Sequence, residues 1–107
     1  MKVVKFGGSS LASATQLEKV FNIVKEDETR QYVVVSAPGK RNAEDTKVTD
    51  ALIKYYKEYT NGKDTSQSQE WIINRYRSIT EELDLDEEII EEISRDIKSL
   101  ATLPKSD

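Results

Sequence analysis

The feature that most constrains the fold is a pair of short apolar runs within residues 1–35. Residues 3–6 form a β-branched and aromatic run that stops at Gly7 and Gly8, as a buried strand stops at a turn. Residues 32–35 form a second apolar run, and it does not alternate with polar residues. Such a run predicts a strand that is covered on both faces.

The segment between these runs predicts an amphipathic helix that ends near Asp27, with Ser10 or Ser13 as its N-cap. A strand, a helix and a strand in this order form a βαβ unit, in which the strands lie parallel with a right-handed crossover. The loops that follow the two strands should then emerge at the same edge of the sheet. The apolar face of the helix is marked by Leu17, Val20, Phe21 and Val24.

Only helices are expected from Lys47 onward. A first helix ends before Asn61 and Gly62, and the last helix stops before Pro104. Two strands are few for a parallel sheet, so the chain is interpreted as the beginning of a larger α/β domain. The apolar positions of the three helices are Val48, Leu52, Tyr55, Tyr56 and Tyr59, then Ile72, Tyr76, Ile79 and Leu83, then Ile89 or Ile90, Ile93, Ile97 and Leu100. The tyrosines favour packing, with stacking on a base as the alternative.

Composition excludes several kinds of chemistry. The chain has no cysteine and no histidine, which removes disulfides, thiolate nucleophiles, imidazole bases and the common zinc sites. Catalysis would depend on lysine, carboxylates, hydroxyls and backbone amides, and we expect no metal bound by the protein itself. The net charge of −4 argues against a nucleic-acid partner. No run is long and apolar enough for a signal peptide or a membrane span, so a soluble, cytoplasmic protein without a membrane partner is expected.

The first candidate site is the glycine loop that follows the first strand, in the sequence KFGGSS from Lys5 to Ser10. Glycines let backbone N–H groups approach phosphate oxygens, a helix N-terminus adds partial positive charge, and a lysine neutralises a transferring phosphoryl group. The loop matches neither the P-loop nor the dinucleotide-binding pattern. The alternative is a tight turn with Lys5 in solvent.

The second candidate site is the loop that follows the second strand, in the sequence SAPGKR from Ser36 to Arg41. It should lie beside the first loop at the carboxyl edge of the sheet, where open α/β sheets bind ligands. The segment from Asp45 to Asp50 then starts a helix with another hydroxyl near its amino end, from Thr46 or Thr49, and such a hydroxyl is suited to binding a carboxylate. The alternatives are a plain turn and a plain cap, and for Lys40 and Arg41 either a solvated loop tip or an attraction for ATP.

Three motifs resemble the opening motifs of the aspartate kinases and occur in the same order. They are VKFGGSSLA at 4–12, VVVSAPGK at 33–40 and KVTDAL at 47–52. These enzymes belong to the amino acid kinase family. The resemblance implies a partial amino acid kinase fold of the carbamate kinase-like type. It covers the whole chain as the N-terminal part, residues 1–107, of an aspartate kinase catalytic domain.

The resemblance also implies an activity and site residues. The parent enzyme transfers the γ-phosphate of ATP, with its Mg2+, to the side-chain carboxylate of L-aspartate, at the first step toward lysine, threonine and methionine. Lys5 would be catalytic and would contact the phosphoryl group. The phosphate path would be lined by Lys5, Phe6, Gly7, Gly8 and Ser9, and aspartate would be bound by Ser36, Ala37 and Thr49.

Family features beyond these motifs do not occur in the sequence. An SRGE-like segment, the nucleotide-binding half with a catalytic aspartate, and the regulatory ACT domains are expected outside this chain, so the isolated chain is expected to be inactive. An unpaired strand edge and apolar helix faces predict a homo-oligomer. The alternatives are another amino acid kinase, or a non-catalytic binding protein on the same fold.

Overall fold

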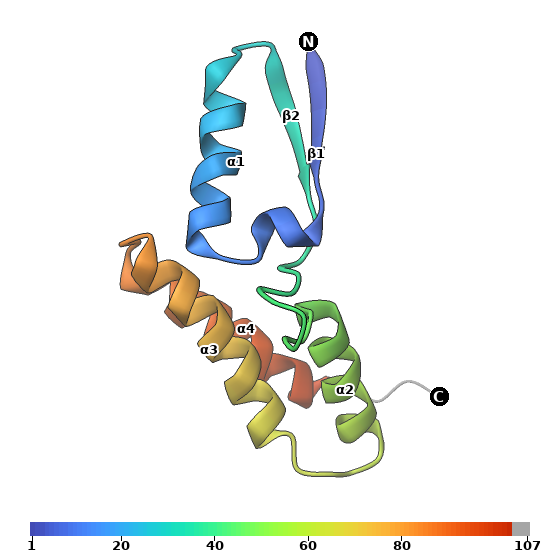
Figure 1. The fold of residues 1–107 in the computed structure, drawn as a ribbon. Helices are drawn as coiled ribbons and strands as arrows, with labels where there is room; N and C mark the ends of the chain where they lie inside the picture. The colour runs from blue at the N-terminus through green and yellow to red at the C-terminus, as the bar shows by residue number, and fades with distance from the viewer. Residues whose placement is uncertain (104–107) are drawn as a thin grey trace. The chain divides into compact units, whose positions relative to one another are not determined.

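The structure is a computed structural model, and it describes residues 1–103. Its contacts divide the chain into two compact units, Met1–Thr49 and Asp50–Asp107. The first unit contains the predicted strands and both candidate loops, and all the regular elements of the second, as far as residue 103, are helices (Figure 1).

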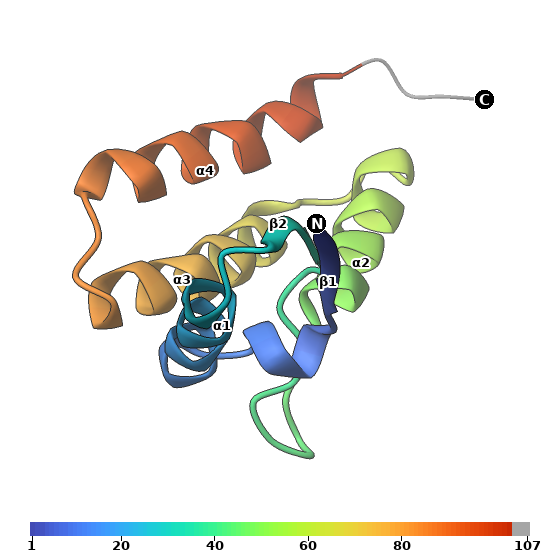
Figure 2. The ribbon, with the colours of Figure 1, turned by 90° about the horizontal axis from the view of Figure 1, so that it is seen from above.

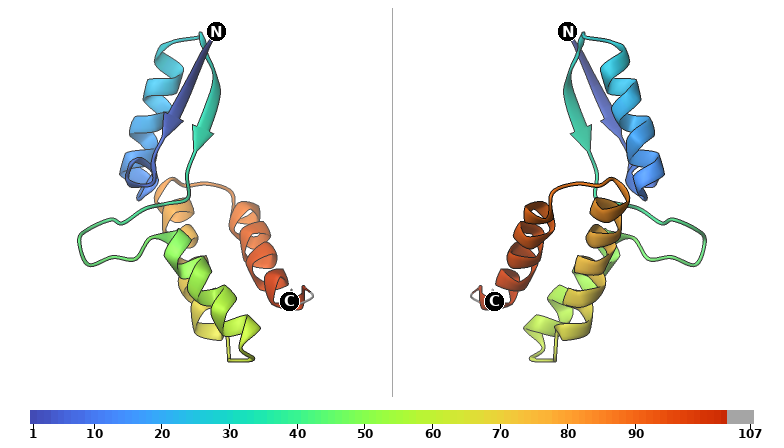
Figure 3. Two further views of the ribbon diagram at one scale, coloured as in Figure 1. Left: turned by 90° about the vertical axis from the view of Figure 1, so that its right-hand side faces the viewer. Right: turned by 90° about the vertical axis from the view of Figure 1, so that its left-hand side faces the viewer.

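The first unit is built on the predicted βαβ arrangement. Strand β1 (Lys2–Phe6) and strand β2 (Arg30–Val35) pair in parallel, with Val4 opposite Val33 and Phe6 opposite Val35. Helix α1 (Ala14–Glu26) connects them and runs alongside both strands (Figure 3). The α/β fold class and the parallel pairing are therefore confirmed.

Side chains form hydrogen bonds at both ends of α1, and that at the N-terminus caps the helix. Ser13, one of the two expected caps, accepts a hydrogen bond from the Gln16 N–H at 3.4 Å. After the helix, the Asp27 carboxylate accepts hydrogen bonds from Lys2 Nζ at 2.6 Å and from the N–H and hydroxyl of Thr29 at 2.9 and 2.6 Å. These bonds, that from Lys2 first, hold the pKa of Asp27 well below its usual range.

The prediction that the second strand is covered on both faces is wrong for the described residues. Tyr32 and Val35 of β2 are more than half exposed, and Val3 of β1 is 66% exposed. The physical reason is that this unit provides one helix for a sheet of two strands. Phe21, expected on the apolar face of α1, is also exposed.

The second unit is a helical assembly centred on Tyr55. Its helices are α2 (Val48–Thr60), which begins in the first unit, α3 (Ser66–Glu82), α4 (Glu87–Ser99) and the short 3-10 helix η2 (Leu100–Thr102). Figure 2 shows α3 and α4 side by side, joined by the turn that contains Asp84. Tyr55 is 2% exposed, and its hydroxyl donates to the Ile97 carbonyl at 2.7 Å. Packing by Tyr55 is thus confirmed, whereas Tyr56 is exposed.

The helix boundaries of this unit agree with most of the predicted signals. Gly62 ends α2 with a positive φ of 70°, as expected from the Asn-Gly pair. Asp86 caps α4, whose first turn is acidic. Helix α3 begins at Ser66, earlier than its apolar pattern suggested, and Pro104 lies outside the described residues.

Candidate phosphate and amino-acid site

Lys5 is the last but one residue of β1, immediately before the first glycine loop. Side chains alternate between the two faces of a strand. Val4 and Phe6 are half-buried, whereas Lys5 and Val3 are exposed. Lys5 therefore lies on the open face of the sheet, and its ammonium group is accessible to a ligand at the end of the strand.

The first glycine loop does not lead directly into the long helix. Gly8–Leu11 forms a short 3-10 helix, η1, in which the Ser10 N–H donates to the Gly7 carbonyl at 3.1 Å. Helix α1 begins only at Ala14. The expectation that a helix N-terminus adds charge at this loop is therefore wrong as regards α1, because η1 separates the glycines from the first turn of α1. Backbone amides and Lys5 remain as the groups that could hold an anion.

The second glycine loop lies directly against the first, as the parallel strands predicted. The Ser36 N–H donates to the Phe6 carbonyl at 3.2 Å, and the Gly39 N–H donates to the Gly8 carbonyl at 2.7 Å. A β-carbon added to Gly39 would meet the Gly8 carbonyl carbon at 2.6 Å. One added to Gly8 would meet the Ala37 oxygen at 3.0 Å. Because the two backbones touch, Gly39 has no room for a β-carbon and Gly8 has very little.

Thr49 is tied to the second loop through its neighbour. The Val48 N–H, at the start of α2, donates to the Pro38 carbonyl at 3.0 Å, and Val48 is fully buried. Thr49 follows as the second residue of α2, and its side chain is exposed. Backbone hydrogen bonds thus link the first loop to the second and the second loop to the residue before Thr49.

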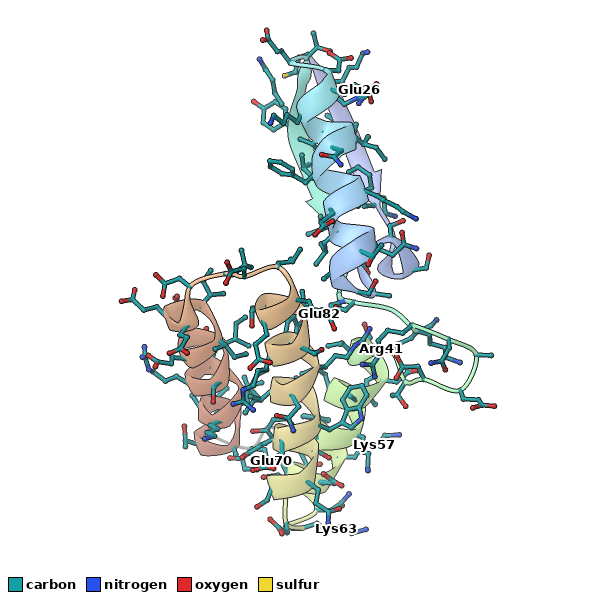
Figure 4. All side chains as sticks on the ribbon, turned by 60° about the vertical axis from the view of Figure 1, so that its left-hand side comes forward. Glu26, Arg41, Lys57, Lys63, Glu70 and Glu82 are labelled. Atoms are coloured by element: carbon teal, nitrogen blue, oxygen red, sulfur yellow. The ribbon has the colours of Figure 1, made fainter. Side chains whose placement is uncertain are left out.

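The segment between the second loop and α2 contains an ion pair that the sequence reasoning missed. Arg41 was expected either at a solvated loop tip or near ATP, but its guanidinium pairs with Asp45, with Nε at 2.6 Å from Oδ2 (Figure 4 labels Arg41). Hydrogen bonds from the Arg41 side chain hold the pKa of Asp45 well below its usual range. The four-residue spacing of opposite charges indicates a pair only within a helix, so the sequence of this loop carried no reliable signal.

The described residues offer no cluster for a protein-bound cation, since no group of three Asp or Glu side chains comes together among residues 1–103. Magnesium is often bound by substrate phosphates with few protein ligands. A magnesium ion bound in that way needs no such cluster from the protein. None of the helices in residues 1–103 has the length and apolar character needed to cross a membrane.

Comparison with known sequences decides the family. The family model described as "Amino acid kinase family" matches residues 1–93. The chain belongs to the amino acid kinase family. It is also 53% identical over 106 residues to aspartokinase 3 of Bacillus subtilis (strain 168), an alignment that covers 99% of this chain and 23% of that protein.

A solved structure agrees with the sequence match. The aspartate kinase of Clostridium acetobutylicum, described as an allosteric enzyme, is 38% identical and superposes with a TM-score of 0.79. The match covers 91% of this chain and 23% of that one. The resemblance to the aspartate kinases is confirmed, and the chain spans about a quarter of the length of these relatives.

Proposed function

We propose that this chain forms part of an aspartate kinase, which transfers the γ-phosphoryl group of ATP to the side-chain carboxylate of L-aspartate and yields 4-phospho-L-aspartate. The observation that carries the proposal is the direct contact of the two glycine loops, with the Gly39 N–H 2.7 Å from the Gly8 carbonyl. This contact supports a shared site because a donor held by one loop would meet an acceptor held by the other.

On the phosphate side, Lys5 is the proposed catalytic residue. Its ammonium would neutralise charge on the transferring group, and the backbone of Gly7, Gly8 and Ser9 would line the path of the phosphates. Phe6 contributes through its backbone, since its carbonyl accepts the hydrogen bond from Ser36 and so joins the two loops. The exposure of Lys5 on the open face of the sheet supports this role.

On the acceptor side, Ser36, Ala37 and Thr49 are the proposed aspartate-binding positions. Ser36 is held at the end of β2 beside Phe6, and the Ala37 carbonyl packs against Gly8. Thr49 comes directly after Val48, whose N–H donates to the Pro38 carbonyl. A small amino acid could thus be bound by hydroxyl and backbone groups close to the phosphate loop.

The reaction fits a chain without histidine or cysteine. An ionised carboxylate is already a nucleophile, so no general base is required. An oxygen of the aspartate carboxylate forms a bond to the γ-phosphorus, and the bond from that phosphorus to the β,γ-bridging oxygen breaks as ADP leaves. Positioning and charge neutralisation carry the rate, with Mg2+ supplied on the nucleotide.

The whole activity is proposed for a longer protein than this chain. We assign three parts of the parent to sequence outside residues 1–107: the half that binds the nucleotide base, a catalytic aspartate and the regulatory ACT domains. The isolated chain should therefore not catalyse phosphate transfer. The parent is proposed to be a cytoplasmic homo-oligomer in lysine, threonine and methionine biosynthesis. The exposed apolar residues of the sheet support the need for further partners.

The test is Lys5→Ala in the complete gene product, assayed for ADP and acyl phosphate formation with ATP and L-aspartate. We expect kcat to fall by roughly 10²–10³-fold, the size seen when one charge-stabilising group is removed. Lys2→Ala is the matched control on the same strand, because its ion pair with Asp27 is exposed and contributes little. Near-normal turnover in the Lys5 variant, or no activity with aspartate in the wild type, would contradict the proposal.

A further inference from the structure

Arg41 and Asp45 form an ion pair that joins side chain and backbone. The Arg41 Nε and Nη2 atoms lie 2.6 and 3.0 Å from Asp45 Oδ2 and Oδ1, which is the two-pronged geometry of a guanidinium on a carboxylate. The backbone N–H of Arg41 also donates to Oδ2 at 2.9 Å. Three hydrogen bonds from one residue therefore converge on one carboxylate.

The burial of this pair is unequal. The Asp45 side chain is 7% exposed, whereas that of Arg41 is 45% exposed. An ordinary surface ion pair contributes little because both partners remain solvated. Here the carboxylate is enclosed by its hydrogen-bond partners within an otherwise exposed loop, so removal of Arg41 would take away the bonds that hold this turn of the loop.

The pair lies across a loop whose base is closed. Pro38 and Val48 are joined by the hydrogen bond between the Val48 N–H and the Pro38 carbonyl, so residues 39–47 leave and return at one place. Within the loop, Asn42 accepts hydrogen bonds from the N–H groups of Glu44 and Asp45, through its side chain and its carbonyl respectively. The loop is therefore folded upon itself at its base, across its middle and at its tip.

What this loop connects is the reason that it matters. Before it stand Ser36 and Ala37, and after it stands Thr49, which are the positions proposed to bind the amino acid. The sequence separates these positions by more than ten residues, and the closed loop brings the backbone of Pro38 to that of Val48. A loop that opened would let the two halves of the acceptor site separate.

We propose that Arg41 and Asp45 are positioning residues, which hold the loop of residues 39–47 closed and thereby align the two halves of the amino-acid site. This inference rests on the proposed function. The inference gives Arg41 an indirect role in binding the acceptor. It replaces the alternative that Arg41 attracts ATP. The guanidinium acts on the substrate only through Asp45 and the loop.

The first test is steady-state kinetics of the complete gene product with Asp45→Asn and Arg41→Gln. We expect the KM for L-aspartate to rise about tenfold in each, the scale of a lost charge-assisted hydrogen bond, while the KM for ATP stays within twofold. Arg41→Lys keeps the positive charge but cannot form both side-chain hydrogen bonds to Asp45. Its KM for L-aspartate should therefore lie between those of the wild type and Arg41→Gln. Glu44→Gln is the matched control, since it removes an exposed charge from the same loop. Equal rises in both KM values, or none, would overturn the inference.

The second test is hydrogen exchange followed by mass spectrometry on the same proteins without substrates. Peptides covering residues 39–48 should exchange several-fold faster in Asp45→Asn than in Glu44→Gln, because the loop opens more often. Equal exchange in the two variants would overturn the inference even if the wild type proved to have no aspartate kinase activity. An inactive wild type would refute the proposed function, whereas the exchange rates alone decide whether the ion pair keeps the loop closed.

Discussion

Replacement of Gly39 by alanine is the most direct test of the contact between the two glycine loops. A β-carbon at this position would lie 2.6 Å from the Gly8 carbonyl carbon, 2.8 Å from its oxygen and 2.9 Å from the Ser9 nitrogen. All three are backbone atoms, so no side chain can rotate away. The loops would have to separate, and the 2.7 Å hydrogen bond from Gly39 to Gly8 would be lost or lengthened.

The size of the effect follows from two contributions. Overpacking in a region that cannot relax costs ~1–3 kcal/mol, and a lost backbone hydrogen bond costs ~1 kcal/mol. Gly39→Ala should therefore lower the free energy of unfolding by about 2–4 kcal/mol. Gly7→Ala is the matched control, because an added β-carbon meets nothing within 4 Å and Gly7 has a φ of −77°. That change should stay within about 0.5 kcal/mol of the wild type.

Urea unfolding followed by far-ultraviolet circular dichroism measures both variants. The midpoint for Gly39→Ala should fall clearly, with little change for Gly7→Ala. Protection of the Gly39 amide from hydrogen exchange, measured by NMR, reports on the contact itself. If Gly39→Ala and Gly7→Ala unfolded at the same urea concentration, the reasoning that the two backbones touch would be refuted.

Two further predictions concern other parts of the chain. Tyr55→Phe removes the hydroxyl that donates to Ile97 and accepts from Gln69, so the free energy of unfolding should fall by ~1–2 kcal/mol. The unfolding midpoint, followed by Trp71 fluorescence, measures this fall. Tyr56→Phe, at an exposed position, should leave the midpoint unchanged, and an unchanged midpoint for Tyr55→Phe would contradict the prediction. Because the folded-state pKa of Asp45 is lowered, its contribution to stability is present above the unfolded value of about 4 and is lost as the pH falls through the acid range. Asp45→Asn should therefore flatten the fall in stability as the pH is lowered from about 5, and a curve parallel to the wild type would disprove this.

The parts of the fold that the sequence predicted are those governed by local pattern. Each of these patterns extends over a few residues. They are the apolar run at residues 3–6, the spacing of Val20 and its neighbours, and the cap at Ser13, and they predicted β1 and α1. The contact of Gly8 with Gly39 was also predictable, because the ends of parallel strands meet at one edge.

The parts that could not be predicted depend on partners remote in sequence or on fine local geometry. A run such as 32–35 has the composition of a covered strand, but its exposure depends on which other elements are present. The sequence left Ser10 and Ser13 open as the N-cap, because apolar spacing does not show that Gly8–Leu11 forms a separate 3-10 helix before Ala14. The pairing of Arg41 with Asp45 depends on the path of a loop without regular structure.

Three of the joints in the candidate site are made by main-chain atoms alone. Ser36 to Phe6, Gly39 to Gly8 and Val48 to Pro38 are all N–H to carbonyl bonds, so none of them requires a particular functional group beyond the glycines. A framework of this kind does not depend on the side chains at Ser36, Ala37 and Thr49, the proposed aspartate-binding positions. If the proposed assignment of those three positions holds, acceptor preference is open to redesign there while the framework keeps its shape, which gives protein engineers a scaffold and a short set of residues to vary.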